Sequence, residues 1–162
     1  MRLLLLRHGI AEDASPRTGF RDAPRELTPE GAARMRAAAD GMAALGIDTE
    51  VVLTSPLIRC RQTAEIVCAR LGGAPVEDGR LCPGMDLDAL EDALLAHPDA
   101  GKLLVCGHEP DLSEAVAGLT GGGLVEFRKG SLALLDVAAV RPAGGRLRAL
   151  YPPSALRRLG AS

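Results

Sequence analysis

Two arginines and two histidines follow short apolar runs of the sequence and are suited to handling a phosphoryl group. Arg7 and His8 come directly after the first run, Arg59 soon after the second, and His108 shortly after the third. Guanidinium groups give forked, charge-assisted hydrogen bonds to phosphate oxygens. A neutral imidazole held among such cations can attack phosphorus as a nucleophile. The residue types therefore predict chemistry on a phosphoryl group.

The three apolar runs predict the strands that position these side chains. They cover residues 3–6, 51–53 and 103–106, and each is uninterrupted, which is typical of a parallel strand buried on both faces. In an open α/β sheet, ligands bind outside the carboxyl ends of the strands. We therefore expect the two histidines and two arginines to converge at that edge of the sheet.

Segments with helical character separate the runs. Thr28-Pro29-Glu30 has the pattern of an N-cap, a proline and an acid in the first turn, and Ser55-Pro56 repeats it, so Ser55 is predicted to cap the second helix. The predicted helices cover residues 29–45, 56–71, 87–97 and 111–119, and shorter strands are predicted around Val76 and over 124–127, 131–137 and 146–150. This alternation predicts a three-layer α/β/α sandwich with a mostly parallel central sheet, formed by one domain over residues 1–162.

The composition excludes several classes of function. Aromatic residues make up only 2% of the chain, which leaves few rings for stacking nucleic-acid bases, and the net charge of −2 provides no basic field for DNA or an anionic membrane. No stretch approaches the roughly 18 apolar residues of a membrane span. The cysteines have no C-x-x-C spacing, as expected for reduced thiols. We therefore expect a cytoplasmic protein that binds neither nucleic acid nor a membrane.

Four segments in this order resemble the histidine phosphatase superfamily. They are R-H-G at residues 7–9, R-E-L-T-P-E-G at 25–31, S-P-L-I-R-C-R-Q-T-A at 55–64 and C-G-H-E-P-D-L-S at 106–113. The chain length and the last segment resemble the SixA branch of that family, whose members remove phosphate from phosphohistidine on proteins. The resemblance implies a phosphoglycerate mutase-like fold.

The resemblance also implies roles for the four residues. His8 is expected to attack phosphorus and form a phosphohistidine intermediate, while Arg7, Arg59 and His108 bind the phosphoryl oxygens. The family pattern implies that the backbone carbonyl of Gly9 holds the second ring nitrogen of His8. Because His8 must be neutral to attack, we expect the neighbouring arginines to lower its pKa.

Gly9, Arg25 and Glu109 are the further candidates for substrate binding. In the family, an arginine before L-T reaches the phosphate pocket, and Arg25 stands at that place, although an ion pair with Asp22 or Glu26 explains it equally well. Glu109 is expected to orient a substrate or a water molecule, but an acid at the start of a helix is equally explained by the helix dipole.

The expected substrate class follows from the absence of a helical insertion that would carry a general acid. Larger relatives carry a helical insertion with a glutamate that protonates the leaving oxygen, and the interval from Leu71 to Lys102 has no room for it. Phosphorylated imidazole leaves as neutral imidazole and needs less help from an acid. We therefore expect a phosphohistidine on a protein of the histidine-containing phosphotransfer type. The alternatives are a phosphatase for sugar, nucleotide or carboxylic-acid phosphates, and a non-catalytic phosphate-binding module.

No cofactor or metal is implied by these residues. Arg7, His8, Arg59 and His108 predict a cationic pocket, which would repel Mg²⁺ or Zn²⁺ in the absence of added carboxylates. The sequence assigns no role to Cys60, although it stands beside Arg59.

Overall fold

A six-stranded sheet forms the centre of the computed structural model, which describes residues 1–161. The strands are β1 (Arg2–Arg7), β2 (Val51–Thr54), β3 (Pro75–Glu77), β4 (Lys102–Gly107), β5 (Leu132–Val137) and β6 (Gly145–Tyr151), in the order β3-β2-β4-β1-β5-β6. The pairs β3–β2, β2–β4 and β4–β1 are parallel, and β5 runs antiparallel to both of its neighbours. The prediction of a mostly parallel sheet is confirmed.

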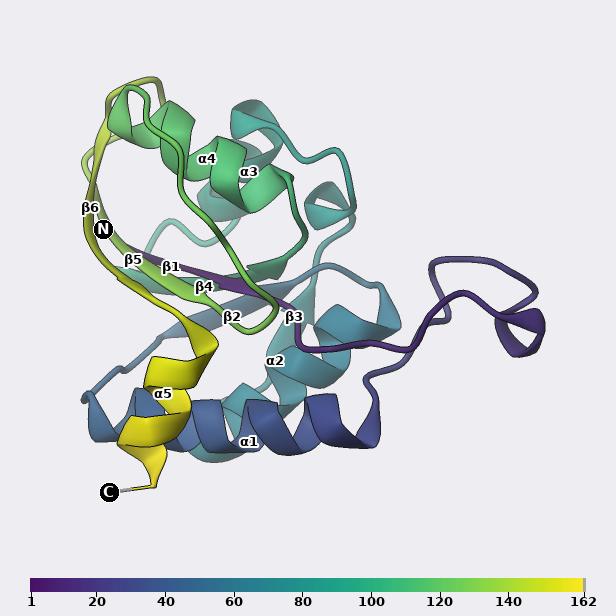
Figure 1. Ribbon diagram of the computed structural model, residues 1–162. Coiled ribbons are helices and arrows are strands. Elements are labelled where there is room, and N and C mark those ends of the chain that lie inside the picture. The colour runs from purple at the N-terminus through teal and green to yellow at the C-terminus, as the bar shows by residue number, and fades with distance from the viewer. Residues whose placement is uncertain (162) are drawn as a thin grey trace.

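Helices cover both faces of the sheet, as Figure 1 shows, with α3 and α4 on one side and α1, α2 and α5 on the other. Their bounds are α1 (Pro29–Ala44), α2 (Ile58–Leu71), α3 (Leu87–Leu95), α4 (Asp111–Thr120) and α5 (Pro153–Gly160), and two short 3₁₀ helices cover Pro16–Thr18 and Gly79–Leu81. The predicted three-layer α/β/α sandwich is therefore confirmed. Among the described helices, none has the length and apolar character needed to cross a membrane.

The alternation of side chains along β1 explains why the sheet needs two helical layers. Leu3 and Leu5 pack into the cluster shared with α3 and α4, whereas Leu4 and Leu6 pack into the cluster shared with α1, α2 and α5. All four leucines are fully buried. Because successive strand residues point to opposite faces, an uninterrupted apolar run requires cover on both sides.

The predicted helix ends are mostly confirmed. Thr28 caps α1 by accepting a hydrogen bond from the backbone N–H of Gly31 at 2.9 Å, and Asp86 caps α3 in the same way. Gly46 follows α1 with a φ of +68°, a conformation that glycine adopts without steric cost. Local side-chain chemistry therefore determines where these helices begin and end.

Two local predictions are wrong, and one helix was not predicted. Ser55 does not cap α2, which begins at Ile58 after Leu57 with no side-chain cap. The segment 124–127 is not a strand, and it pairs with none of the six strands of the sheet. Helix α5 was not predicted at all. It forms because Leu156 buries its side chain completely against α1, which only the tertiary structure provides.

Candidate active site

The carboxyl ends of three adjacent strands bring the site together. Arg7 ends β1 opposite Gly107, the last residue of β4, and β2 lies on the other side of β4. The backbone N–H of His8 donates to the carbonyl of Gly107 at 3.2 Å, and that of Ser55 donates to the carbonyl of Cys106 at 3.1 Å. The register of the sheet therefore holds the residues that follow each strand beside one another.

The imidazole of His8 is buried and held in one tautomer. Its Nδ1 lies 2.7 Å from the carbonyl oxygen of Gly9, which can only accept, so Nδ1 carries the proton. Burial, together with the charges of Arg59, His108 and Arg7, lowers the pKa of His8 to about 3 against the opposing hydrogen bond to Gly9. The pKa moves in the expected direction, but burial rather than the arginines is the largest cause. Nε2 consequently keeps its lone pair at neutral pH.

Arg59 lies between the two histidines. Its side chain is almost fully buried, its Nε donates to His8 Nε2 at 3.2 Å, and its Nη2 lies 3.2 Å from His108 Nδ1. The rings of His8 and His108 have their centroids 5.5 Å apart. Helix α2 begins one residue before Arg59, so the first turn of the helix places this side chain over the sheet edge.

The orientation of His108 depends on Ser55. Nε2 of His108 lies 2.9 Å from Ser55 Oγ. Because a guanidinium can only donate, His108 Nδ1 accepts from Arg59, and Nε2 therefore carries the proton that Ser55 accepts. Ser55 is thus a positioning residue for His108 and not a helix cap.

Arg7 presents an unsatisfied donor. Its Nη1 donates to the carbonyl of Phe127 at 2.6 Å, whereas its buried Nε has no hydrogen-bond partner among residues 1–161. Burial lowers the pKa of Arg7, and the nearby charge of Glu109 opposes that shift. A buried donor without a partner is costly, so this atom favours the arrival of an acceptor.

Asp22 brings a carboxylate to the same place from the loop between β1 and α1, which projects from the body of the molecule in Figure 1. It accepts from Arg59 Nη2 at 2.8 Å and from Arg25 Nη1 at 2.8 Å. Burial raises the pKa of Asp22, but the hydrogen bonds from Arg25 and Arg59 outweigh it, so the net shift is downward. Asp22 is therefore an ionised carboxylate that occupies the two guanidinium groups.

These side chains surround a cavity of about 400 Å³, which we call the phosphoryl cavity. It is lined by Arg7, His8, Asp22, Arg25, Arg59, Pro83, His108, Glu109 and Lys129. Arg25 satisfies both of its predicted alternatives, since it pairs with Asp22 and also lines the cavity. The carboxylate of Glu109 accepts from Ser113 at the start of α4 while it lines the cavity.

Gly9 does not line the phosphoryl cavity, and its backbone holds the site together instead. Its backbone N–H donates to Thr63 Oγ at 3.1 Å, so it is not free for a substrate, and its carbonyl holds His8. Thr63 Oγ in turn donates to the carbonyl of Arg59 at 2.7 Å. Thr63 therefore links the backbones of the segments that carry His8 and Arg59. Among residues 1–161, no group of three or more His, Cys, Asp or Glu side chains is placed to hold a metal ion.

Comparison with known proteins assigns the family. The sequence model of the histidine phosphatase superfamily (branch 1) matches residues 3–82. The solved structure of the protein histidine phosphatase SixA complexed with tungstate has a TM-score of 0.84 and 25% identity, and the match covers 96% of this chain and 99% of that one. The chain belongs to the histidine phosphatase superfamily.

Other relatives of this histidine phosphatase extend the comparison. An uncharacterised protein of Picosynechococcus is 42% identical over 147 residues, which are 86% of this chain and 87% of that protein. A structure from Agrobacterium tumefaciens assigned as the phosphohistidine phosphatase SixA has a TM-score of 0.80 at 26% identity and covers 94% of this chain and 97% of its own. The alpha-ribazole phosphatase from Shigella flexneri shares the fold at 18% identity, with a TM-score of 0.73 and coverage of 94% and 97%.

Four residues that make contacts in the site of this histidine phosphatase were missed by the sequence analysis. Ser55 and Thr63 both lie in the segment 55–64 that carries the family resemblance, so their presence there was the available signal. Asp22 had no such signal, because its place over Arg59 depends on the path of the loop before α1. Cys60 places its thiol 3.5 Å from His108 Nε2. A contact with the Cys106 thiol and the nearby His108 lower the pKa of the Cys60 thiol, despite its burial.

Proposed function

We propose that the protein is a phosphatase that removes the phosphoryl group from phosphohistidine on another protein, through a phosphohistidine intermediate at His8. The observation that carries this proposal is the neutral Nε2 of His8, buried beside Arg59 and opposite His108 at the wall of a cationic cavity. A nucleophile needs an available electron pair, and that of Nε2 becomes available when Arg59 Nε transfers its hydrogen bond from Nε2 to a phosphoryl oxygen. A transferring phosphoryl group needs fixed cations around its oxygens.

The first step forms a bond between His8 Nε2 and phosphorus and breaks the phosphorus–nitrogen bond of the substrate. The substrate imidazole, protonated on its far nitrogen, takes the bonding electrons and leaves as neutral imidazole. Arg7 and Arg59 bind the phosphoryl oxygens, with Arg7 Nε gaining the acceptor that it lacks, and His108 binds one once its Nδ1, released from Arg59, has taken up a proton. Gly9 stabilises the positive charge that develops on His8, because its carbonyl accepts the Nδ1 proton.

The second step is attack of water on the phosphorus of phosphorylated His8. The phosphorus–Nε2 bond breaks and its electrons return to Nε2, while both protons of the water leave on the released inorganic phosphate. His8 thereby returns to its neutral form with the proton still on Nδ1. No part of the cycle requires the protein to donate a proton to an alkoxide. Substrate entry displaces the Asp22 carboxylate from Arg59, since both anions need the same guanidinium.

The chemistry of the cavity supports an imidazole leaving group. Of the residues that line it, Asp22 and Glu109 are the carboxylic acids. Asp22 is ionised and paired with two arginines, and a group with a lowered pKa is a poor proton donor at neutral pH. An alkoxide would need such a donor, whereas imidazole does not. We further propose that the partner is a cytoplasmic phosphotransfer protein and that Arg25 and Glu109 border its phosphohistidine.

The test is turnover of a phosphohistidine peptide by the wild-type protein and by His8→Ala, with release of phosphate as the readout. We expect the wild type to be active and labelled phosphate to be trapped on the protein by rapid alkaline quench. H8A should show neither activity nor label. A suitable control is His97→Ala, which removes a histidine outside the cavity and should leave both readouts unchanged. Turnover retained in H8A would contradict the mechanism.

A small phosphorylated metabolite is the second candidate substrate, because alpha-ribazole phosphatase shares this fold. Rates on the phosphohistidine peptide and on a panel of sugar, nucleotide and carboxylic-acid phosphates separate the two. A strong preference for one ester would overturn the protein substrate while leaving the role of His8 intact. We also expect activity to persist in EDTA, since the lining of the cavity is cationic.

A further inference from the structure

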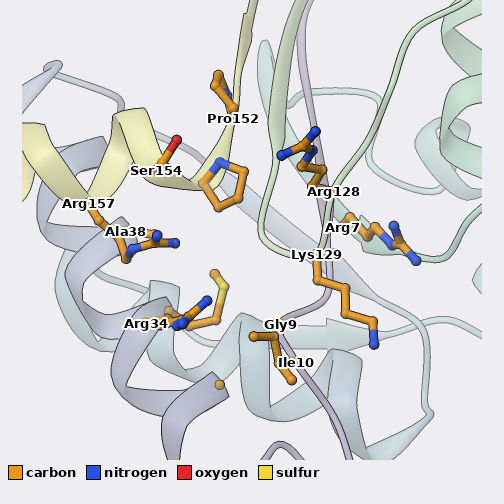
Figure 2. Close-up of a pocket in the computed structure, with 13 residues that line it drawn as sticks. Arg7, Gly9, Ile10, Arg34, Ala38, Arg128, Lys129, Pro152, Ser154 and Arg157 are labelled. Atoms are coloured by element: carbon orange, nitrogen blue, oxygen red, sulfur yellow. The ribbon is translucent and has the colours of Figure 1, made fainter.

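A second cavity lies directly beside the phosphoryl cavity. It has a volume of about 420 Å³, and Arg7 and Lys129 line both cavities, so these two side chains form the wall between them. We call it the basic cavity, defined by Arg34, Arg128 and Arg157 together with that shared wall. Figure 2 shows Arg34 and Arg157 on one side of it and Arg128, Lys129 and Arg7 on the other.

The charges around the basic cavity are not balanced within the protein. Five of its lining residues are cations, and none is an acid. Arg34 pairs with Glu30 and Arg128 pairs with Glu126, but Lys129 and Arg157 have no ion-pair partner among residues 1–161. Like charges gathered around one hollow repel one another, and an anion bound there would relieve that repulsion. The protein as a whole carries a net charge of −2, so the concentration of positive charge is local.

Part of the lining of the basic cavity is apolar. It is formed by Ile10, Met35, Ala38, Pro152 and Pro153. A free phosphate ion would gain nothing from such a surface. A glutamate or aspartate side chain fits it better, because its methylene groups can contact the apolar residues while its carboxylate binds the guanidinium groups of the same cavity.

We propose that the basic cavity binds acidic side chains next to the phosphorylated histidine of a protein substrate. The inference rests on the proposed function for its choice of substrate and on the cavity itself for the chemistry of recognition. The phosphoryl group enters one cavity, and a carboxylate of the same protein enters the neighbouring one. The basic cavity thereby selects phosphohistidine proteins with an acidic surface around the modified residue.

The experiment compares two phosphohistidine peptides, one with glutamates flanking the histidine and one with glutamines at the same positions. The test variant is the double substitution Arg34→Gln with Arg157→Gln. The control is Arg36→Gln with Arg148→Gln, which removes the same charge from residues that line other cavities. We expect the test variant to lose about tenfold in kcat/KM on the acidic peptide, mainly through KM, and to keep its rate on the neutral peptide. The control should behave as the wild type.

Binding of a fluorescent acidic peptide without phosphate, followed by anisotropy, separates the two proposals. If the wild type hydrolyses neither phosphopeptide, the proposed function fails, and weaker binding in the test variant alone still establishes the basic cavity as an acidic-peptide site. Equal binding by the wild type and the test variant overturns the inference, whatever the activity. An equal loss of rate on both peptides also overturns it, since that result assigns Arg34 and Arg157 a structural role.

Discussion

His8 owes its neutral state mainly to its place at the buried end of β1. Only 6% of the residue is exposed, and burial outweighs the neighbouring cations as the cause of its lowered pKa. The carbonyl of Gly9 works in the opposite direction, because it stabilises the protonated ring. The carbonyl of Gly9 thus selects the tautomer of His8 but also raises its pKa, and burial lowers that pKa by more.

The pKa of about 3 for His8 predicts a loss of stability in acid. Between pH 6.5 and 3, the unfolded chain binds a proton at His8 that the folded protein excludes, so stability falls as pH falls. From pH 7 to 5 this contribution amounts to about 2 kcal/mol. In urea unfolding at the two pH values, His8→Asn should remove that part of the pH dependence, and His97→Asn should keep it. An unchanged pH dependence in H8N would contradict the assignment.

Asp22 acts as an internal competitor for the anion site. Its carboxylate takes the same Nη2 of Arg59 that a phosphoryl oxygen requires, at 2.8 Å. Arg25 shares the pair, so one carboxylate neutralises two guanidinium groups while the cavity holds no substrate. The arrangement keeps both side chains oriented before the substrate binds.

Removing the negative charge of Asp22 should strengthen the binding of anions in the phosphoryl cavity. We expect Asp22→Asn to lower the inhibition constant of inorganic phosphate by about 3- to 10-fold, because the competing carboxylate is lost and the asparagine is neutral. Asp13→Asn, on the same loop but outside the cavity lining, is the control and should not change it. Weaker inhibition in D22N would mean that Asp22 serves mainly to hold Arg59 in position.

At the scale of elements, α5 docks on α1 through glycine. An added Cβ at Gly41 of α1 would lie 1.9 Å from the carbonyl oxygen of Leu156, and one at Gly160 would lie 2.5 Å from the carbonyl oxygen of Ala37. The backbones of the two helices therefore approach too closely for any larger residue. This contact places Pro152 and Arg157 against the basic cavity.

Gly41→Ala should consequently destabilise the protein, although alanine is the better helix former. The intrinsic gain is about 1 kcal/mol, whereas forcing a methyl group into a close-packed contact costs about 1–3 kcal/mol. The contact here is with backbone, which cannot rotate away, so we expect a net loss in urea unfolding. Gly79→Ala is the control, because nothing lies within 4 Å of its added Cβ. A G41A protein as stable as the wild type would show that α5 shifts at little cost.

At the scale of the whole molecule, positive charge is concentrated where β1, β2 and β4 end, although the chain is acidic overall. The two hydrophobic clusters on either face of the sheet hold these strands in register. The folded state therefore keeps several cations close together, and the unfolded chain separates them. An oxyanion that binds only the folded state should stabilise it.

Tungstate is a suitable oxyanion for measuring this stabilisation of the folded state. At about 100 times its dissociation constant, a ligand of this kind stabilises the folded state by about 2.7 kcal/mol. For a chain of this size we expect the melting temperature to rise by about 5–10 °C. Arg59→Gln should abolish most of the shift, and Arg148→Gln, outside both the phosphoryl and the basic cavity, should retain it. An equal shift in R59Q would place the anion elsewhere.

The sequence by itself determined most of the strands and the ends of most of the predicted helices, because those depend on local properties. An apolar run such as residues 3–6 can only be stable when it is buried, and caps such as Thr28 and Asp86 act on backbone groups within the same turn. The position of Arg7, His8 and His108 at strand ends followed from the same reasoning, since parallel strands end at a common edge.

Only the tertiary structure decided what each side chain at that edge contacts. Ser55 looked like a helix cap until the register of β2 and β4 placed it against His108, and Asp22 reached Arg59 across 37 positions of sequence. The segment 124–127 has no strand to pair with, whereas α5 has a surface of α1 to pack against. Whether either segment becomes regular depends on which surfaces the rest of the chain leaves open. Contacts between residues far apart in sequence follow from packing, which no local pattern encodes.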